Sequence, residues 1–189
     1  MIGLLTVAVL TLLPPAPAKN DIEKVVDEMT LPGMTVGVLV TECGTVNAAY
    51  YPPARTLIVC KELLLVTPKP ALRFIVAHEM AHAIIHQLDI PVPGSEEAAA
   101  DEMAAVALLT DGDREAVLAA ALWMEGKGGD EDVWDAHQSD RKRAAVLMCL
   151  EDGSEDSPML PECQAQLAHA AYVWRRLIHW RLTPEVAPQ

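Results

Sequence analysis

The segment His78-Glu79-Met80-Ala81-His82 constrains this chain most, because its spacing has a clear chemical meaning on a helix. The two histidines are four residues apart, about one helical turn, so their imidazole rings lie on the same face. Two imidazoles in this arrangement can bind one metal ion together. Glu79 projects beside them, where it can accept a proton from a water molecule at the metal. The segment therefore predicts a helix that carries a metal site.

The same helix has an apolar face, and both histidines belong to it. Pro68 and Pro70 suit a helix start, and Asp89-Ile90-Pro91 suits its end. One histidine on an apolar face is usually a core side chain with a hydrogen-bonded neighbour, whereas two around a glutamate favour metal binding. The positions that follow helical spacing on this face are Ala71, Phe74, Ile75, His78, His82 and Ile85.

A second predicted helix, which begins after Ser95, offers the missing ligand. A catalytic zinc usually has three protein ligands and one position left for water. Glu97 and Asp101 are one turn apart, and their side of the helix continues into apolar residues. A carboxylate on such a face must be paired or metal-bound, because an isolated buried charge is costly. We expect Glu97 to be the third ligand and Asp101 to orient one of the two histidines, with exchanged roles as the alternative.

The short turn Pro91-Val92-Pro93-Gly94 joins the two helices. We therefore expect them to pack antiparallel, with the carboxylates facing the histidines. Glu96 and Glu102 fit a solvated face of the second helix better than a buried one. His86 extends the histidine series by one turn, but it lies near the helix end and is expected at the surface.

Ahead of these helices the chain predicts a short helix and a small sheet. Three segments rich in β-branched and aromatic residues are separated by Cys43-Gly44 and Pro52-Pro53, and the short connections allow hairpins. The expected fold class is α+β: a small, mostly antiparallel sheet and a predominantly helical remainder in one domain, residues 19–189. The strands are expected at 34–41, 46–51 and 56–59, and the other helices at 21–29, 114–125, 140–151 and 162–181.

The first residues have the pattern of a secretory signal peptide. An apolar run from Met1 to Leu13 is too short to span a bilayer, and Ala16-Pro17-Ala18 resembles a cleavage site. A basic start is missing, so an uncleaved anchor or a different start residue is the alternative. We expect residues 1–18 to be a signal peptide, the chain to be exported, and no later segment to span a membrane.

The cysteines and the net charge fit an exported protein. Four cysteines are an even number, which favours disulfides, and no Cys-x-x-Cys supports a thiolate metal site. The simplest pairing joins neighbours, Cys43 with Cys60 and Cys149 with Cys163. The net charge of -13 leaves no basic surface of the kind that nucleic acids or anionic lipids require, so neither is an expected partner.

An HExxH sequence followed by a glutamate and, four residues later, an aspartate on a second helix resembles the glutamate-liganded zincins. More narrowly, the chain is similar to a family of exported bacterial proteins classed as metallopeptidases of unknown function. The resemblance implies a zincin-like fold, Zn2+ as cofactor and a peptide or protein substrate outside the cytoplasm, periplasmic or secreted. The similar segments are 42–44, 47–50, 58–63, 78–82, 88–91, 96–101, 134–137 and Arg143 to Cys149.

His137 is a second catalytic candidate. It lies between Asp135 and Asp140, in a segment similar to the family, and a histidine held by an aspartate can donate to a developing oxyanion. A loop histidine that caps the next helix is the alternative. Arg143 could serve as that donor or bind a substrate carboxylate, but a structural ion pair is favoured. The family commonly has an aromatic pair and an asparagine after this arginine, where this chain has residues 144–146, Ala-Ala-Val.

These observations predict an exported zinc metallopeptidase. His78, His82 and Glu97 would bind Zn2+, and Glu79 would be the general base that activates water for the hydrolysis of a peptide bond. The alternative is an exported metal-binding or protein-interaction domain of the same fold without catalytic activity. In a third interpretation the HExxH sequence is accidental.

Overall fold

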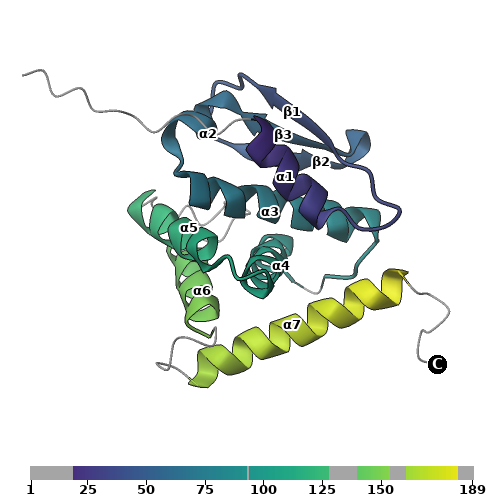
Figure 1. Cartoon of the computed structure of the whole chain (residues 1–189), viewed down its shortest axis with the longest axis vertical. Helices are drawn as coiled ribbons and strands as arrows, with labels where there is room; N and C mark the ends of the chain where they lie inside the picture. Colours follow the sequence, from purple (N-terminus) through teal and green to yellow (C-terminus); the bar gives the residue numbers. More distant parts are fainter. Residues whose placement is uncertain (1–18, 93, 128–139, 154–160, 183–189) are drawn as a thin grey trace, which may run out of the picture.

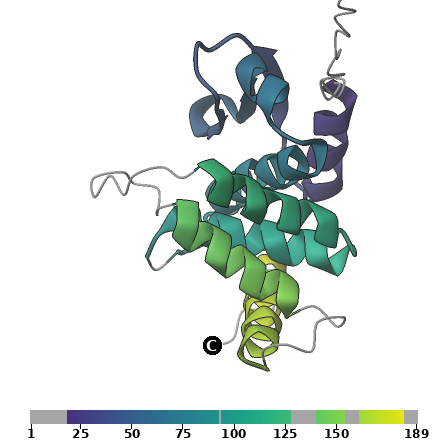
Figure 2. The ribbon, with the colours of Figure 1, turned by 90° about the vertical axis from the view of Figure 1, so that its left-hand side faces the viewer.

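The computed structural model describes residues 19–92, 94–127, 140–153 and 161–182. A three-stranded sheet lies on one side of the long helix α3, and most of the remaining helices lie on the other side (Figures 1 and 2). The elements in chain order are α1 (Lys19–Met29), β1 (Gly37–Thr41), β2 (Ala48–Tyr51), the 3-10 turn η1 (Pro52–Ala54), β3 (Thr56–Cys60), α2 (Lys61–Val66), α3 (Lys69–Gln87), α4 (Glu96–Thr110), α5 (Arg114–Lys127), α6 (Asp140–Asp152) and α7 (Pro161–Leu182).

The predicted α+β class is confirmed, and most predicted elements are present within a few residues of their expected ends. The clearest omission is α2, which follows β3 without a gap. Its six residues are too few to show helical periodicity, so the sequence offers little sign of it. Residues 1–18, where the signal peptide is predicted, lie outside the described residues.

The prediction of a mostly antiparallel sheet is wrong. The strand order is β1-β3-β2, with β1 parallel to β3 and only β2 antiparallel to it. Residues 42–47 therefore form no hairpin and lead the chain from one edge of the sheet to the other. The Glu62 carboxylate accepts the backbone N–H groups of Cys43 and Gly44, at 3.2 and 2.7 Å. These bonds hold the connection beside the end of β3, so β2 adds to the far side of that strand.

Both predicted disulfides are present. Cys43–Cys60 links the connection after β1 to the last residue of β3, and Cys149–Cys163 links α6 to α7. A second contact holds α7: the Trp174 Nε1–H donates to Glu102 Oε1 at 2.8 Å. The expectation that Glu102 lies on a solvated face is therefore wrong. The helix α7 packs against α4, and Trp174 of α7 covers the Glu102 carboxylate and donates a hydrogen bond to it.

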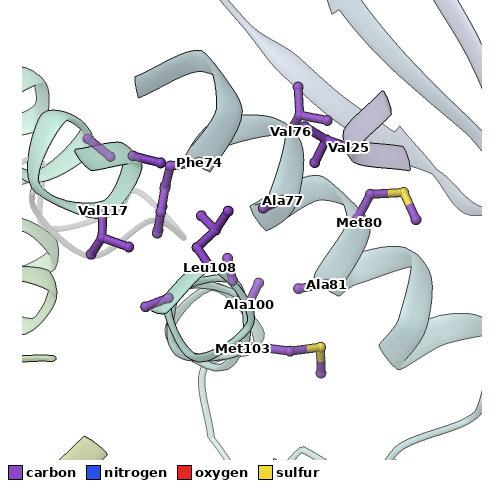
Figure 3. Packing of buried hydrophobic residues seen from close by; sticks show 14 of the residues in the cluster. Val25, Phe74, Val76, Ala77, Met80, Ala81, Ala100, Met103, Leu108 and Val117 are labelled. Carbon is purple, nitrogen blue, oxygen red and sulfur yellow. The ribbon is translucent and has the colours of Figure 1, made fainter. Parts of the chain in front are cut away.

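The core surrounds α3. Its fully buried Phe74 points towards α4 and α5, where Leu108 and Val117 lie (Figure 3). Val76 points to the other side, towards Val25 of α1. Since α3 packs against the sheet, α1, α4 and α5, a polar side chain on its inner faces must find its partners within the protein.

The helices α3 and α4 cross at a steep angle and do not lie side by side along their length (Figures 1 and 3). Their contacts nevertheless run in opposite directions along the chain, from the pair His78 and Asp101 to the pair His86 and Glu96, and the carboxylates face the histidines as expected.

The buried side chains between the two helices include the small Ala77 and Ala81 of α3 and Ala100 of α4, beside the larger Met103 and Leu108 of α4 (Figure 3). Alanines allow two helices to approach closely at the point where they meet. The beginning of α4 lies beside His78 and His82, and Leu108 near its end lies beside Phe74.

Within the described ranges, none of the helices combines the length and the apolar character that a membrane span needs.

We expect Phe74→Ala to lower the free energy of unfolding by about 3–5 kcal/mol, because the lost ring leaves a cavity beneath α3. Urea denaturation followed by circular dichroism measures the change. Leu122→Ala removes a side chain that is 54% exposed and serves as the control. Its expected effect is within about 0.5 kcal/mol. Equal losses in the two variants would contradict this description of the core.

Candidate metal centre

Three predicted ligands converge where α4 begins beneath α3. His78 Nε2 lies 3.2 Å from Glu97 Oε2, and His82 Nε2 lies 3.4 Å from Glu97 Oε1. The two Nε2 atoms are 3.2 Å apart. The three residues lie within 19 positions of one another in the sequence. His78 and His82 belong to α3, and Glu97 belongs to α4.

The donor set fits a zinc ion. Ligand atoms at about 2.0–2.1 Å from zinc in a tetrahedral arrangement are roughly 3.3 Å apart. The separations between the two imidazole nitrogens and the Glu97 oxygens are close to this value. Two imidazoles and a carboxylate are also donors that zinc commonly has, and three protein ligands leave a position for water.

The start of α4 places the carboxylates. The Ser95 hydroxyl caps the helix by accepting the Ala98 N–H at 3.3 Å, as its position before the acidic residues predicts. Glu96 and Glu97 then occupy the first turn, where the helix dipole favours negative charge. The crossing of the helices points this turn at the two histidines.

Asp101 lies behind His78, away from the Nε2 atoms. Its Oδ1 is 2.8 Å from His78 Nδ1, within hydrogen-bonding distance but poorly aligned with the N–H direction. Arg143 of α6 binds the same carboxylate through two hydrogen bonds, from Nε at 2.7 Å and from the terminal nitrogen at 2.8 Å. This geometry favours Asp101 as the residue that orients His78 and favours the structural ion pair for Arg143.

Glu96 has a role in the geometry that sequence reasoning missed. Its Oε1 is 2.7 Å from His82 Nδ1 and 3.2 Å from His86 Nε2. The Glu96 side chain is 38% exposed, so it is partly solvated as expected, but the first turn of α4 also brings it against the end of α3. In the sequence only its place beside Glu97 could have indicated this contact, and Glu102, which is also acidic and close by, shows that such a place is not specific. His86 is 44% exposed, as expected for a residue near the helix end.

Glu79 is buried between the histidines and the sheet. Its Oε2 accepts the backbone N–H of Tyr50, in the edge strand β2, at 2.7 Å. Burial raises the pKa of the Glu79 carboxyl, and the adjacent His78 and His82 offset part of this effect. Nothing in the sequence indicates Tyr50 as a partner, because it lies 29 residues away in a different element.

The electrostatics of the cluster favour a cation. Burial alone would lower the pKa of His78, but its contacts with Asp101 and Glu97 outweigh burial and raise that pKa to about 9. Burial would raise the pKa of Glu97, yet its hydrogen bonds to the two histidines hold it well below the usual range. The pKa of Asp101 is lowered against burial by Arg143 and His78. The carboxylates therefore stay ionised around the imidazoles.

His137, the second catalytic candidate, lies in residues 128–139, outside the described part of the chain. Cys43, Cys60 and Glu62 also have ligand atoms within 4.8 Å of one another. Both sulfur atoms there belong to a disulfide, so they are not thiolate ligands.

Comparison with known protein families places the chain in one family. The family model described as "Putative metallopeptidase" matches residues 66–166, more than half of the chain. The matched range contains the HExxH segment, the start of α4 and Arg143. The description implies a metal ion and a protein or peptide substrate. Comparisons with curated proteins and with solved structures give no match.

We expect Asp101→Asn to weaken zinc binding by about 10–100-fold, because His78 loses the charged group that orients its ring. Competition with a chromogenic chelator at fixed pH measures the affinity. Glu102→Gln is the matched control, since Glu102 contacts Trp174. Circular dichroism checks that both variants are folded. An unchanged affinity in Asp101→Asn would show that the contact has no orienting effect.

The roles of the two neighbouring glutamates can be separated in the same assay. Glu97→Ala should abolish stoichiometric zinc binding because it removes a ligand. Glu96→Ala should only weaken binding, by about 10–100-fold, because it removes a partner of His82 and no ligand. If Glu97→Ala kept one tightly bound zinc per chain, another residue would have to be the third ligand.

Proposed function

Since the chain belongs to the metallopeptidase family whose model it matches, we propose that it is a zinc-dependent peptidase with a zincin-like fold. His78, His82 and Glu97 are the proposed ligands, and Asp101, Glu96 and Arg143 support them. The observation that carries the proposal is the convergence of the three ligand groups beside the buried Glu79.

The chemistry follows from the positions of these side chains. A zinc ion in the site would lower the pKa of a water molecule to about 7 and polarise the carbonyl group of the substrate. Glu79 is the proposed general base. Its Oε2 is held by Tyr50, which leaves Oε1 to accept the proton from that water. The raised pKa makes the carboxylate a stronger base, and the protonated group can then protonate the leaving amine.

We retain His137 as the proposed donor to the oxyanion that develops as water attacks. The support is its position between two aspartates in a segment similar to the family and inside the matched range.

Export is part of the proposal. Two disulfides occur in the described part of the chain, and such bonds form and persist in oxidising compartments. The apolar run from Met1 to Leu13 before Ala16-Pro17-Ala18 has the pattern of a signal peptide. Both features support a periplasmic or secreted peptidase.

Glu79→Gln tests the mechanism directly. We expect the variant to keep one zinc ion per chain and to lose peptide hydrolysis by about 100- to 10,000-fold, because it lacks the general base. Zinc is measured by mass spectrometry of the metal. Hydrolysis is measured by digestion of a defined peptide library, with cleavage products identified by mass spectrometry.

Two controls make this result specific. Chelation with EDTA should remove the activity of the wild type, and added zinc should restore it. Glu102→Gln should retain full activity, because the Glu102 carboxylate contacts Trp174 of α7 and none of the proposed ligands. Full activity in Glu79→Gln would contradict the mechanism. A wild type that binds zinc and cleaves no peptide would support the non-catalytic metal-binding domain instead.

A further inference from the structure

The backbone N–H of Tyr50 points away from its own sheet. The Cys60 N–H donates to the Asn47 carbonyl at 3.0 Å, and hydrogen-bonded pairs alternate along an antiparallel ladder, so Ala49 and Tyr51 face β3 with their amides. The Tyr50 N–H is therefore directed to the free edge of β2. There it donates to Oε2 of Glu79 in α3 at 2.7 Å, in a buried hydrogen bond. An edge strand thus supplies a hydrogen bond to the proposed general base.

The side chain of Tyr50 is held from the end of α3. Its hydroxyl accepts a hydrogen bond from Gln87 Nε2 at 3.0 Å. Its ring is buried, and its centroid is 6.2 Å from that of His86. The strand is therefore held at one residue by both its backbone and its side chain, and both partners belong to α3.

Both the oxygen and the nitrogen of the Gln87 amide form hydrogen bonds. Its Oε1 accepts the Thr35 N–H, and its Nε2 donates to the Thr35 carbonyl, each at 3.1 Å. The second hydrogen of Nε2 goes to the Tyr50 hydroxyl. A primary amide has two N–H donors, so both are used, and the reversed orientation would lose both bonds to Thr35. Gln87 therefore fixes the segment before β1 and the strand β2 together.

The contacts form a closed hydrogen-bonded circuit, that is, a ring of contacts that runs from Glu79 through Tyr50 to Gln87 and back along α3. Glu79 and Gln87 are two helical turns apart on α3, and Tyr50 bridges them, through its amide at one end and its hydroxyl at the other. A carboxylate held at one oxygen presents the other at a defined place. General-base catalysis depends on such placement, because the base must lie within hydrogen-bonding reach of the proton that it removes.

We propose that Tyr50 is a positioning residue for Glu79 and that Gln87 holds Tyr50 in register with it. The role of Glu79 as the base rests on the proposed function. The hydrogen-bonded circuit is a property of the fold and can be tested separately.

The catalytic test compares two adjacent tyrosines. Tyr50→Phe removes only the oxygen that Gln87 binds, whereas Tyr51→Phe changes a side chain that is 52% exposed. The probe is a quenched fluorescent peptide whose sequence comes from the best-cleaved member of the peptide library. We expect Tyr50→Phe and Gln87→Met each to lower kcat by about 10-fold with KM changed less than about 2-fold, since small misplacements of a catalytic group slow chemistry more than binding. Tyr51→Phe should match the wild type.

The structural test measures hydrogen exchange of the β2 amides by NMR and needs no substrate. In the wild type the Tyr50 amide should exchange at least about 10-fold more slowly than the Ala48 amide, which points to the same free edge. Glu79→Ala should remove this protection at Tyr50 and leave Ala49 and Tyr51, which face β3, unchanged. Gln87→Met should reduce protection at Tyr50 in the same way.

The two tests separate the two proposals. If the wild type cleaves no peptide, the proposed function fails, and the exchange rates alone decide the inference. If the wild type is active but Tyr50→Phe and Gln87→Met both behave like Tyr51→Phe, the inference is overturned and the proposed function stands. Exchange at Tyr50 as fast as at Ala48 would also overturn the inference.

Discussion

The burial of charged groups between α3 and α4 is the constraint on which the rest of the structure depends. Glu79, His78 and Asp101 are each less than 10% exposed, and a buried charge without a partner would cost several kcal/mol. Each partner comes from a different part of the fold. Arg143 brings α6 to Asp101, and the Tyr50 amide brings β2 to Glu79. The buried charged groups of α3 and α4 therefore require that α6 and β2 pack beside them.

Small residues between α3 and α4 allow the two helices to pack closely. Alanines near the crossing of α3 and α4 let the helices approach, and the crossing directs the first turn of α4 at the histidines. The contact between the helices extends along α4, from the turns that carry Glu96, Glu97 and Asp101 to Leu108, which lies beside Phe74 of α3 (Figure 3).

Hydrogen bonds and ion pairs support the site on two sides. Glu96 and Asp101 contact the outer ring nitrogens of the two histidines from α4, and Arg143 fixes Asp101 from α6. On the other side Gln87 and Tyr50 fix the strand beside Glu79. A metallopeptidase needs such support because ligands and base must keep their geometry while a substrate enters and products leave.

The sequence by itself determined what local patterns encode. Helical spacing placed His78, Glu79 and His82 on one helix, the cap at Ser95 placed Glu97 at the start of the next, and neighbouring cysteines indicated the disulfides. Only the tertiary structure decided the parallel pairing of β1 with β3, the steep helix crossing and the contacts of Glu96 and Glu102. These depend on the path of the chain between elements. Periodicity shows which face of an element is buried, but not which partner covers that face.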